Sequence, residues 1–175
     1  AVVLSGDDGN DNLTGSDFAD TIFGGAGNDT ITGGLLADTM TGGAGVNTFR
    51  YAAAADTGAV ATGVVDVITD FKNTGVLTTT DFIGGTFGTT LRFGAAAGYA
   101  DYATALTQVA TITGAGAASV VAAVGSGTSW TAYLFNDTNG VTAAGVDGAI
   151  QLGTTGQFGT AALALASIDA AQIIA

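Results

Sequence analysis

The sequence predicts a mainly β protein, in which stacked repeats are followed by a β-rich cap with one short helix. A nine-residue pattern recurs five times between residues 6 and 50 without a change of spacing. Glycine, carboxylate and apolar side chains each keep a fixed column of that pattern, so no unit can bury its apolar side chain alone and the units must stack. After residue 50 the pattern gives way to strand-like segments and one helical stretch.

The columns divide each repeat into a turn and a short strand. The first column is always glycine: Gly6, Gly15, Gly24, Gly33 and Gly42. The sixth is polar, with Asp11, Asp20, Asp29, Asp38 and Asn47, and the eighth is apolar, with Leu13, Ile22, Ile31, Met40 and Phe49. Glycines allow the tight turn, and the apolar residue points inward because side chains alternate along a strand.

Two repeats complete one coil of 18 residues, so alternate repeats lie above one another. Asp11, Asp29 and Asn47 then share one edge of the stack, and Asp20 and Asp38 share the other. Parallel strands lie about 4.8 Å apart, and two carboxylates at that distance repel by up to a few kcal/mol at an effective dielectric near ~20. Bound cations would offset this repulsion.

Composition also favours cation binding. All 15 acidic residues are Asp and only Arg50, Lys72 and Arg92 oppose them, which gives a net charge of −12. Such a chain is a poor candidate for binding nucleic acid or anionic membranes. It contains no Cys or His, which excludes thiol, imidazole and zinc chemistry, and no apolar run approaches the ~20 residues of a transmembrane helix. Among cations Ca²⁺ ranks before Mg²⁺, because it accepts six to eight oxygens in flexible geometry at about 2.3–2.6 Å.

The repeat from Gly24 to Thr32, Gly-Gly-Ala-Gly-Asn-Asp-Thr-Ile-Thr, resembles the RTX (haemolysin-type) calcium-binding nonapeptide. The resemblance implies a parallel β-roll with Ca²⁺ held between turns 18 residues apart. It also implies ligation by the side chains of Asp11, Asp20, Asp29 and Asp38. The candidate ligands in the turns, through backbone carbonyls above all, are Gly6, Asp8, Gly9, Asn10, Gly24, Ala26, Gly27, Asn28, Gly33 and Gly42. In the alternative interpretation the Asp residues only cap glycine-rich turns.

Three departures from the repeat bear on particular sites. Phe18 and Leu36 replace the fourth-column glycine, both on the edge of Asp20 and Asp38, so we expect stronger sites on the Asp11 and Asp29 edge. Asn47 supplies at best a neutral ligand and marks the end of the array. At the other end Leu4 already falls in the apolar column, which suggests that the chain begins inside a longer array.

We therefore divide the chain into a roll at residues 1–50 and a cap at residues 51–175. We expect cap strands at 64–71, 91–93 and 149–152, a helix at 99–113, and a hairpin from 118–124 and 130–135. Asp66 and Asp70 stand an even number of residues apart and would share one strand face. They could bind a further calcium ion or form a solvated face.

The cap carries weaker resemblances. The segments 47–51, 66–71 and 81–83 resemble the region after the roll in serralysin-type and other RTX exoproteins, and 131–140 and 148–153 resemble the carboxyl-terminal region of type I secretion substrates. Asp169 shortly before an apolar terminus is similar to the uncleaved signals of that class. These resemblances imply export by the type I secretion machinery and an extracellular or cell-surface location.

The predicted function is that of a non-catalytic, calcium-binding carboxyl-terminal module of a secreted bacterial protein. Its composition resembles S-layer or other surface structural proteins, whose partners would be further copies of the chain or cell-surface polysaccharide. The alternative is the RTX tail of a protease, lipase or toxin whose catalytic domain lies upstream of Ala1. Asp56-Thr57-Gly58 spells the aspartic-protease tripeptide, but it occurs once and that chemistry needs two carboxylates.

Overall fold

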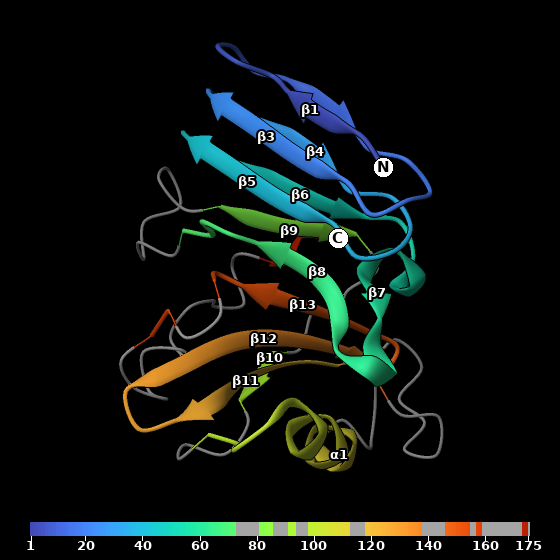
Figure 1. Cartoon of the computed structure of the whole chain (residues 1–175), viewed down its shortest axis with the longest axis vertical. Coiled ribbons are helices and arrows are strands. Elements are labelled where there is room, and N and C mark those ends of the chain that lie inside the picture. The colour runs from blue at the N-terminus through green and yellow to red at the C-terminus, as the bar shows by residue number, and fades with distance from the viewer. Residues whose placement is uncertain are drawn as a thin grey trace.

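The computed structural model describes residues 1–72, 81–85, 91–93, 98–112, 118–137, 146–154, 157–158 and 173–174. Its strands form two sheets, and the stack runs from the N-terminus at the top of Figure 1 to the cap at the bottom. One sheet has the order β1-β3-β5-β8-β13-β12-β11-β10, and the other has the order β14-β9-β6-β4-β2. The expectation of a mainly β protein with one short helix is confirmed.

The strands of the repeats alternate between the two sheets. They are β1 (Val3–Ser5), β2 (Asn12–Thr14), β3 (Thr21–Ala26), β4 (Thr30–Thr32), β5 (Thr39–Ala44) and β6 (Thr48–Tyr51). All pairs are parallel, with Ile22 beside Met40 in one sheet and Leu13 beside Ile31 in the other. Both pairings are 18 residues apart, as the predicted coil requires.

The eighth column forms the core of the roll. Ile22, Ile31 and Phe49 are 0% exposed and Met40 is 1% exposed. Burying an aliphatic or aromatic side chain of this size stabilises the fold by about 1.5–3 kcal/mol. The stack of apolar side chains therefore holds the two sheets together.

Parallel stacking does not end at residue 50. The strand β8 (Val64–Ile68) pairs with β5, placing Ile68 beside Met40, and β9 (Phe82–Gly85) pairs with β6, placing Ile83 beside Phe49. The spacing is no longer 18, because a short strand and two 3-10 turns fill the connection: η1 (Ala54–Thr57), β7 (Gly58–Ala59) and η2 (Val60–Thr62). One further, irregular coil thus follows the repeats.

The cap extends the larger sheet and packs one helix against it. Its elements are β10 (Leu91–Phe93), α1 (Tyr102–Ile112), β11 (Ala118–Ser126), β12 (Ser129–Asp137), β13 (Gly148–Leu152) and β14 (Ile173–Ile174). β13 joins β8 in parallel and β12 antiparallel, so the core of the roll continues into the cap. The helix begins after Asp101, whose carboxylate accepts a hydrogen bond from the Thr104 amide at 2.7 Å. Of the helices in the described ranges, none is long and apolar enough to cross a membrane.

Several predicted elements differ in length, and the helix expected at 99–113 begins only at Tyr102. The strand expected at 64–71 ends at Ile68, because the chain turns at Thr69 and Asp70. The hairpin is longer than expected, since Ser126 and Ser129 still pair across a turn in which Gly127 has a φ of 58°. Asn139 and Asp169, part of the segments compared with secretion substrates, lie outside the described residues.

Candidate metal centre

The sixth-column side chains form a hydrogen-bonded ladder along each edge of the roll. On one edge the Asp11 amide donates to Oδ1 of Asp29 at 2.9 Å, and the Asp29 amide donates to Oδ1 of Asn47 at 3.0 Å. On the other edge the Asp20 amide donates to Oδ1 of Asp38 at 2.8 Å. One side-chain oxygen of Asp29, Asp38 and Asn47 is thus used to join the coils.

Each ladder extends one step beyond the repeats. The Asp38 amide donates to Oδ1 of Asp66 at 2.7 Å, and the Asn47 amide donates to Oδ1 of Asp81 at 2.8 Å. Asp81 was not among the candidate site residues. The signal that could have found it is the triplet Asp-x-apolar, because Asp66-Val-Ile and Asp81-Phe-Ile have the same order as Asp29-Thr-Ile.

The second oxygen of several ladder carboxylates has no protein partner. Within the described residues, Oδ2 of Asp11, Asp29 and Asp38 is buried and accepts no hydrogen bond. Asp29 and Asp38 are each only 1% exposed. Burying a charged oxygen without compensation costs several kcal/mol, so these atoms require a proton or a cation.

The first-column glycines show where a cation fits. A Cβ added to Gly6 would lie 2.5 Å from the carbonyl oxygen of Gly24 and 2.6 Å from Oδ2 of Asp11. One coil on, the same position at Gly24 is enclosed by Oδ2 of Asp29 and the carbonyl of Gly42. Carboxylate and carbonyl oxygens from adjacent coils therefore converge beside glycine, and such hard oxygens are the ligands that Ca²⁺ prefers.

Backbone carbonyls must supply a large part of any coordination shell. Among the described residues, no three acidic side chains gather closely enough to form a metal site by themselves. On the other edge the carbonyl of Gly33 and Oδ2 of Asp20 enclose the corresponding position beside Gly15. The predicted combination of side-chain and carbonyl ligands thus fits the geometry on both edges.

The other candidate turn residues hold successive turns together. The Gly9 amide donates to the Ala26 carbonyl at 2.8 Å, and the Gly27 amide donates to the Ala44 carbonyl at 3.0 Å. Asp8 forms an isolated parallel bridge with Ala26. The side-chain oxygens of Asn10 and Asn28 accept hydrogen bonds from the Asn28 and Val46 amides, at 2.7 and 2.8 Å. These two side chains therefore stack the turns.

The two edges differ at Asp20, where Ser16 replaces the second-column glycine. The Ser16 hydroxyl donates to Oδ2 of Asp20 at 2.8 Å, and the Val2 amide donates to Oδ1 at 2.6 Å. Burial raises the pKa of Asp20, but these two bonds and a third from the Ser16 amide hold the pKa below its usual value. Asp20 consequently needs a cation less than Asp29 does.

Phe18 and Leu36 lie on that same edge and are 61% and 52% exposed. Leu36 has a φ of 67°, a backbone conformation that favours glycine. The structure thus retains a glycine-like turn there with a less suitable residue.

Burial makes Asp38 and Asp66, which follow Asp20 along its edge of the roll, weaker acids than an ordinary aspartate. It raises the pKa of Asp38 to about 6 and that of Asp66 to about 8. Repulsion from the Asp20 carboxylate adds to the shift of Asp38, and repulsion from the Asp38 carboxylate adds to that of Asp66. Burial also raises the pKa of Asp81 on the other edge. Without bound cations, Asp38 and Asp66 therefore hold their protons at a higher pH than an ordinary aspartate does.

Asp66 and Asp70, the additional candidates, have separate roles. Asp66 is 0% exposed, so the interpretation of a solvated strand face is wrong for this residue. Asp70 lies beyond the end of β8, and its carboxylate accepts hydrogen bonds from the Gly42 and Gly43 amides at 2.8 and 2.7 Å. The two residues do not share a strand face.

The protease-like tripeptide has local structural roles. The Asp56 carboxylate accepts hydrogen bonds from the Ala52 and Ala53 amides at 2.9 and 2.8 Å. Thr57 is fully buried, and its Oγ1 donates to the Ala54 carbonyl and accepts from the Ala149 amide. This turn joins η1 to β13 of the cap.

Comparison with known proteins agrees with the geometry. A four-copy sequence model of the RTX calcium-binding nonapeptide repeat matches residues 5–40 and 37–57. No curated protein matches the chain. Among solved structures, the solution structure of the AlgE6R3 subunit from the Azotobacter vinelandii mannuronan C5-epimerase is similar, with a TM-score of 0.55, 22% identity, and coverage of 98% of this chain and 77% of that one. The repeats within these matched residues are therefore RTX calcium-binding nonapeptide repeats, a family that binds Ca²⁺, and here they form a parallel β-roll.

Proposed function

We propose that this chain is a non-catalytic module of a secreted bacterial protein and that it folds when it meets extracellular calcium. The observation that carries the proposal is the set of buried Oδ2 atoms on Asp11, Asp29 and Asp38, which accept no hydrogen bond from the described residues. Ionised and without cations, these carboxylates oppose stacking of the coils. With Ca²⁺ between the coils, the same atoms hold the stack together.

The expected energies suit a calcium-controlled transition. Extracellular calcium modules bind with dissociation constants of about 10⁻⁴ to 10⁻³ M. Millimolar Ca²⁺ then adds roughly 1 kcal/mol per site to the stability of the folded state. Several sites together supply a substantial part of the few kcal/mol by which small domains are stable.

This linkage also suits export. In a cytosol poor in free calcium, repulsion among the Asp residues would keep the repeats loose and able to pass through the type I secretion machinery. Outside the cell, calcium would close the coils one upon another. The net charge of −12 strengthens the repulsion in the calcium-free state.

A calcium titration followed by far-ultraviolet circular dichroism tests the proposal. In calcium-free buffer we expect reduced β structure, which rises cooperatively at about 10⁻⁴ to 10⁻³ M Ca²⁺. Titration with Mg²⁺ is the matched control and should restore less structure, because Mg²⁺ demands near-octahedral geometry and retains water. Complete β structure in excess chelator would overturn the proposal.

Within this class we favour a structural role at the cell surface, as in an S-layer. Abundant Ala, Thr and Gly, with few basic side chains, support this choice. The partners would be other copies of the chain or cell-surface polysaccharide. Two-dimensional sheets that form with calcium and are visible by electron microscopy would support the role, whereas a chain that stays monomeric with millimolar calcium and binds no cell-wall polysaccharide would refute it.

A second candidate is the accessory module of an extracellular enzyme. The fold similarity to a subunit of a mannuronan C5-epimerase favours this candidate. Catalysis would then belong to a domain upstream of Ala1. Sequencing the gene in the upstream direction separates the two candidates, since a zinc motif or nucleophile elbow would support the enzyme.

A further inference from the structure

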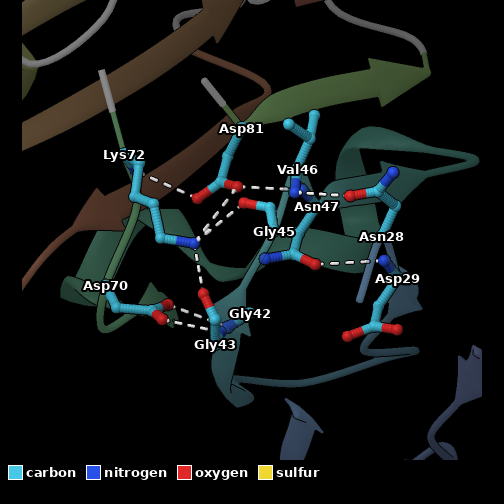
Figure 2. Close-up of polar contacts among 10 residues, drawn as sticks. All are labelled: Asn28, Asp29, Gly42, Gly43, Gly45, Val46, Asn47, Asp70, Lys72 and Asp81. Atoms are coloured by element: carbon cyan, nitrogen blue, oxygen red, sulfur yellow. Dashed lines mark hydrogen bonds and ion pairs between the residues drawn. The ribbon is translucent and has the colours of Figure 1, made fainter. Parts of the chain in front are cut away.

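The turn of the fifth repeat faces a lysine side chain. Nζ of Lys72 donates to the carbonyl oxygen of Gly43, lies 3.2 Å from the carbonyl oxygen of Gly45, and lies 3.8 Å from Oδ1 of Asp81 (Figure 2). All three neighbours are oxygens, and an ammonium group has three N–H donors. The Asp81 side chain is fully buried, and the Lys72 side chain is 31% exposed.

The position corresponds to a step of the calcium-binding ladder. The Asp81 carboxylate accepts a hydrogen bond from the Asn47 amide, just as the Asn47 side chain accepts one from the Asp29 amide. Asp81 therefore takes the place of the sixth-column residue in the next coil. Gly43 and Gly45 stand in the second and fourth columns of their repeat, one coil after Gly25 and Gly27. The Lys72 ammonium therefore lies where a glycine-rich turn meets the carboxylate of the following coil.

In the part of the following coil that the structure describes, no second glycine-rich turn lies beside Gly42 and Gly43 to complete a calcium site. Asp70 and Lys72 lie there instead (Figure 2). The Asp70 carboxylate accepts from the two amides of the turn, and the Lys72 ammonium donates to two of its carbonyls. Asp70 and Lys72 thus provide partners for both the amides and the carbonyls of the last glycine-rich turn.

We propose that Lys72 is a built-in cation that ends the calcium column, with its ammonium held between the carbonyls of one turn and the carboxylate of the following coil, as a calcium ion would be held between earlier coils. Among the described residues, it neutralises the last ladder carboxylate of this edge without a bound metal. The junction between roll and cap can then form before calcium binds, and the earlier coils add to it as calcium arrives. This inference rests on the proposed calcium-dependent folding.

Lys72→Ala tests the assignment, and Arg50→Ala is the matched control. Both variants lose one positive charge, but the exposed Arg50 side chain lies on β6 and outside this turn. Truncating Lys72 leaves its backbone amide to donate to Oδ2 of Asp81 and opens space for Ca²⁺ and water beside the same three oxygens. The measurements are bound calcium per chain by equilibrium dialysis with ⁴⁵Ca, and the urea midpoint in chelator and in 10 mM CaCl₂.

We expect Lys72→Ala to bind one more calcium ion per chain than wild type and Arg50→Ala. Its urea midpoint should fall in chelator and return close to that of Arg50→Ala in calcium. An unchanged calcium count, an equal loss of stability in both buffers, or failure to fold in 10 mM calcium would each overturn the assignment. If wild type proves fully folded in chelator, the proposed function fails, whereas the calcium count still decides the role of Lys72.

Discussion

Acidification should promote folding of the calcium-free protein, because Asp38 and Asp66 hold protons more tightly when folded. Their pKa values are about 6 and about 8, compared with 3.8 for an ordinary aspartate. Groups with a raised pKa contribute stability that is full below the unfolded pKa and is lost as the pH rises through the folded pKa. The stability of the calcium-free roll should therefore decrease from pH 4 to pH 8.

The structure also indicates the size of this effect. For a carboxyl group with the two pKa values of Asp66, 3.8 and about 8, proton linkage gives a loss of roughly 4 kcal/mol between pH 5 and pH 8, and Asp38 adds roughly 1 kcal/mol. This sum is comparable to the whole stability of a small domain. We expect β structure to appear on acidification even without calcium.

Asp66→Asn supplies the control for this prediction. Its amide oxygen can accept from the Asp38 amide, as Asn47 accepts from Asp29 on the other edge. The variant should be more stable than wild type in calcium-free buffer at pH 8, and its pH dependence should be smaller. Circular dichroism and urea unfolding at pH 5–8 measure both effects. If Asp66→Asn has the same pH profile as wild type, Asp66 does not carry the effect.

Calcium should reverse the sign of the pH dependence. Carboxylate ligands must lose their protons to bind a metal, so calcium affinity falls as the pH falls. In saturating calcium the urea midpoint should rise from pH 5 to pH 7. A midpoint that falls over this range would contradict the assignment of these carboxylates to calcium.

Three substitutions test the site and the core of the roll. Asp29→Asn should weaken calcium binding in calorimetry more than Asp20→Asn, because the oxygens of Asp20 already accept hydrogen bonds from Ser16 and Val2; equal losses would contradict the difference between the edges. Gly24→Ala should abolish the calcium-induced change in circular dichroism, since its Cβ would meet the oxygens expected to bind the ion, and an unchanged titration would refute that placement. Ile31→Ala should cost about 2–5 kcal/mol in urea unfolding with calcium, whereas Val3→Ala, at a side chain 74% exposed, should cost little; equal costs would contradict the core assignment.

The roll could be predicted from the sequence because its period is uninterrupted. An invariant spacing of nine residues fixes which strands stack, and the apolar column identifies Ile31 and Phe49 as core residues. The same period places Asp11 and Asp29 on one edge. In this part of the chain the residue spacing alone determines which strands pair and which side chains point inward, so the prediction needs no knowledge of tertiary contacts.

The coil after the repeats could not be predicted in this way. Its ladder residues, Asp66 and Asp81, follow Asp38 and Asn47 by 28 and 34 residues rather than by 18. The extra residues between these strands change the spacing but leave the Asp-x-apolar triplets intact. The hydrogen-bond partners of Asp70 and Lys72 depend on the path of the chain after the repeats, which only the folded structure shows.

The continuity between roll and cap determines how calcium binding spreads. Met40 and Phe49 of the roll share one buried cluster with Leu134 and Ile150 of the cap, so the last coils pack against the apolar core of the cap. In a stack where each coil contacts only its neighbours, stability is a sum of coil and interface contributions. The first coils, far from the cap, must therefore depend most on calcium, and coil closure should proceed from the cap towards the N-terminus.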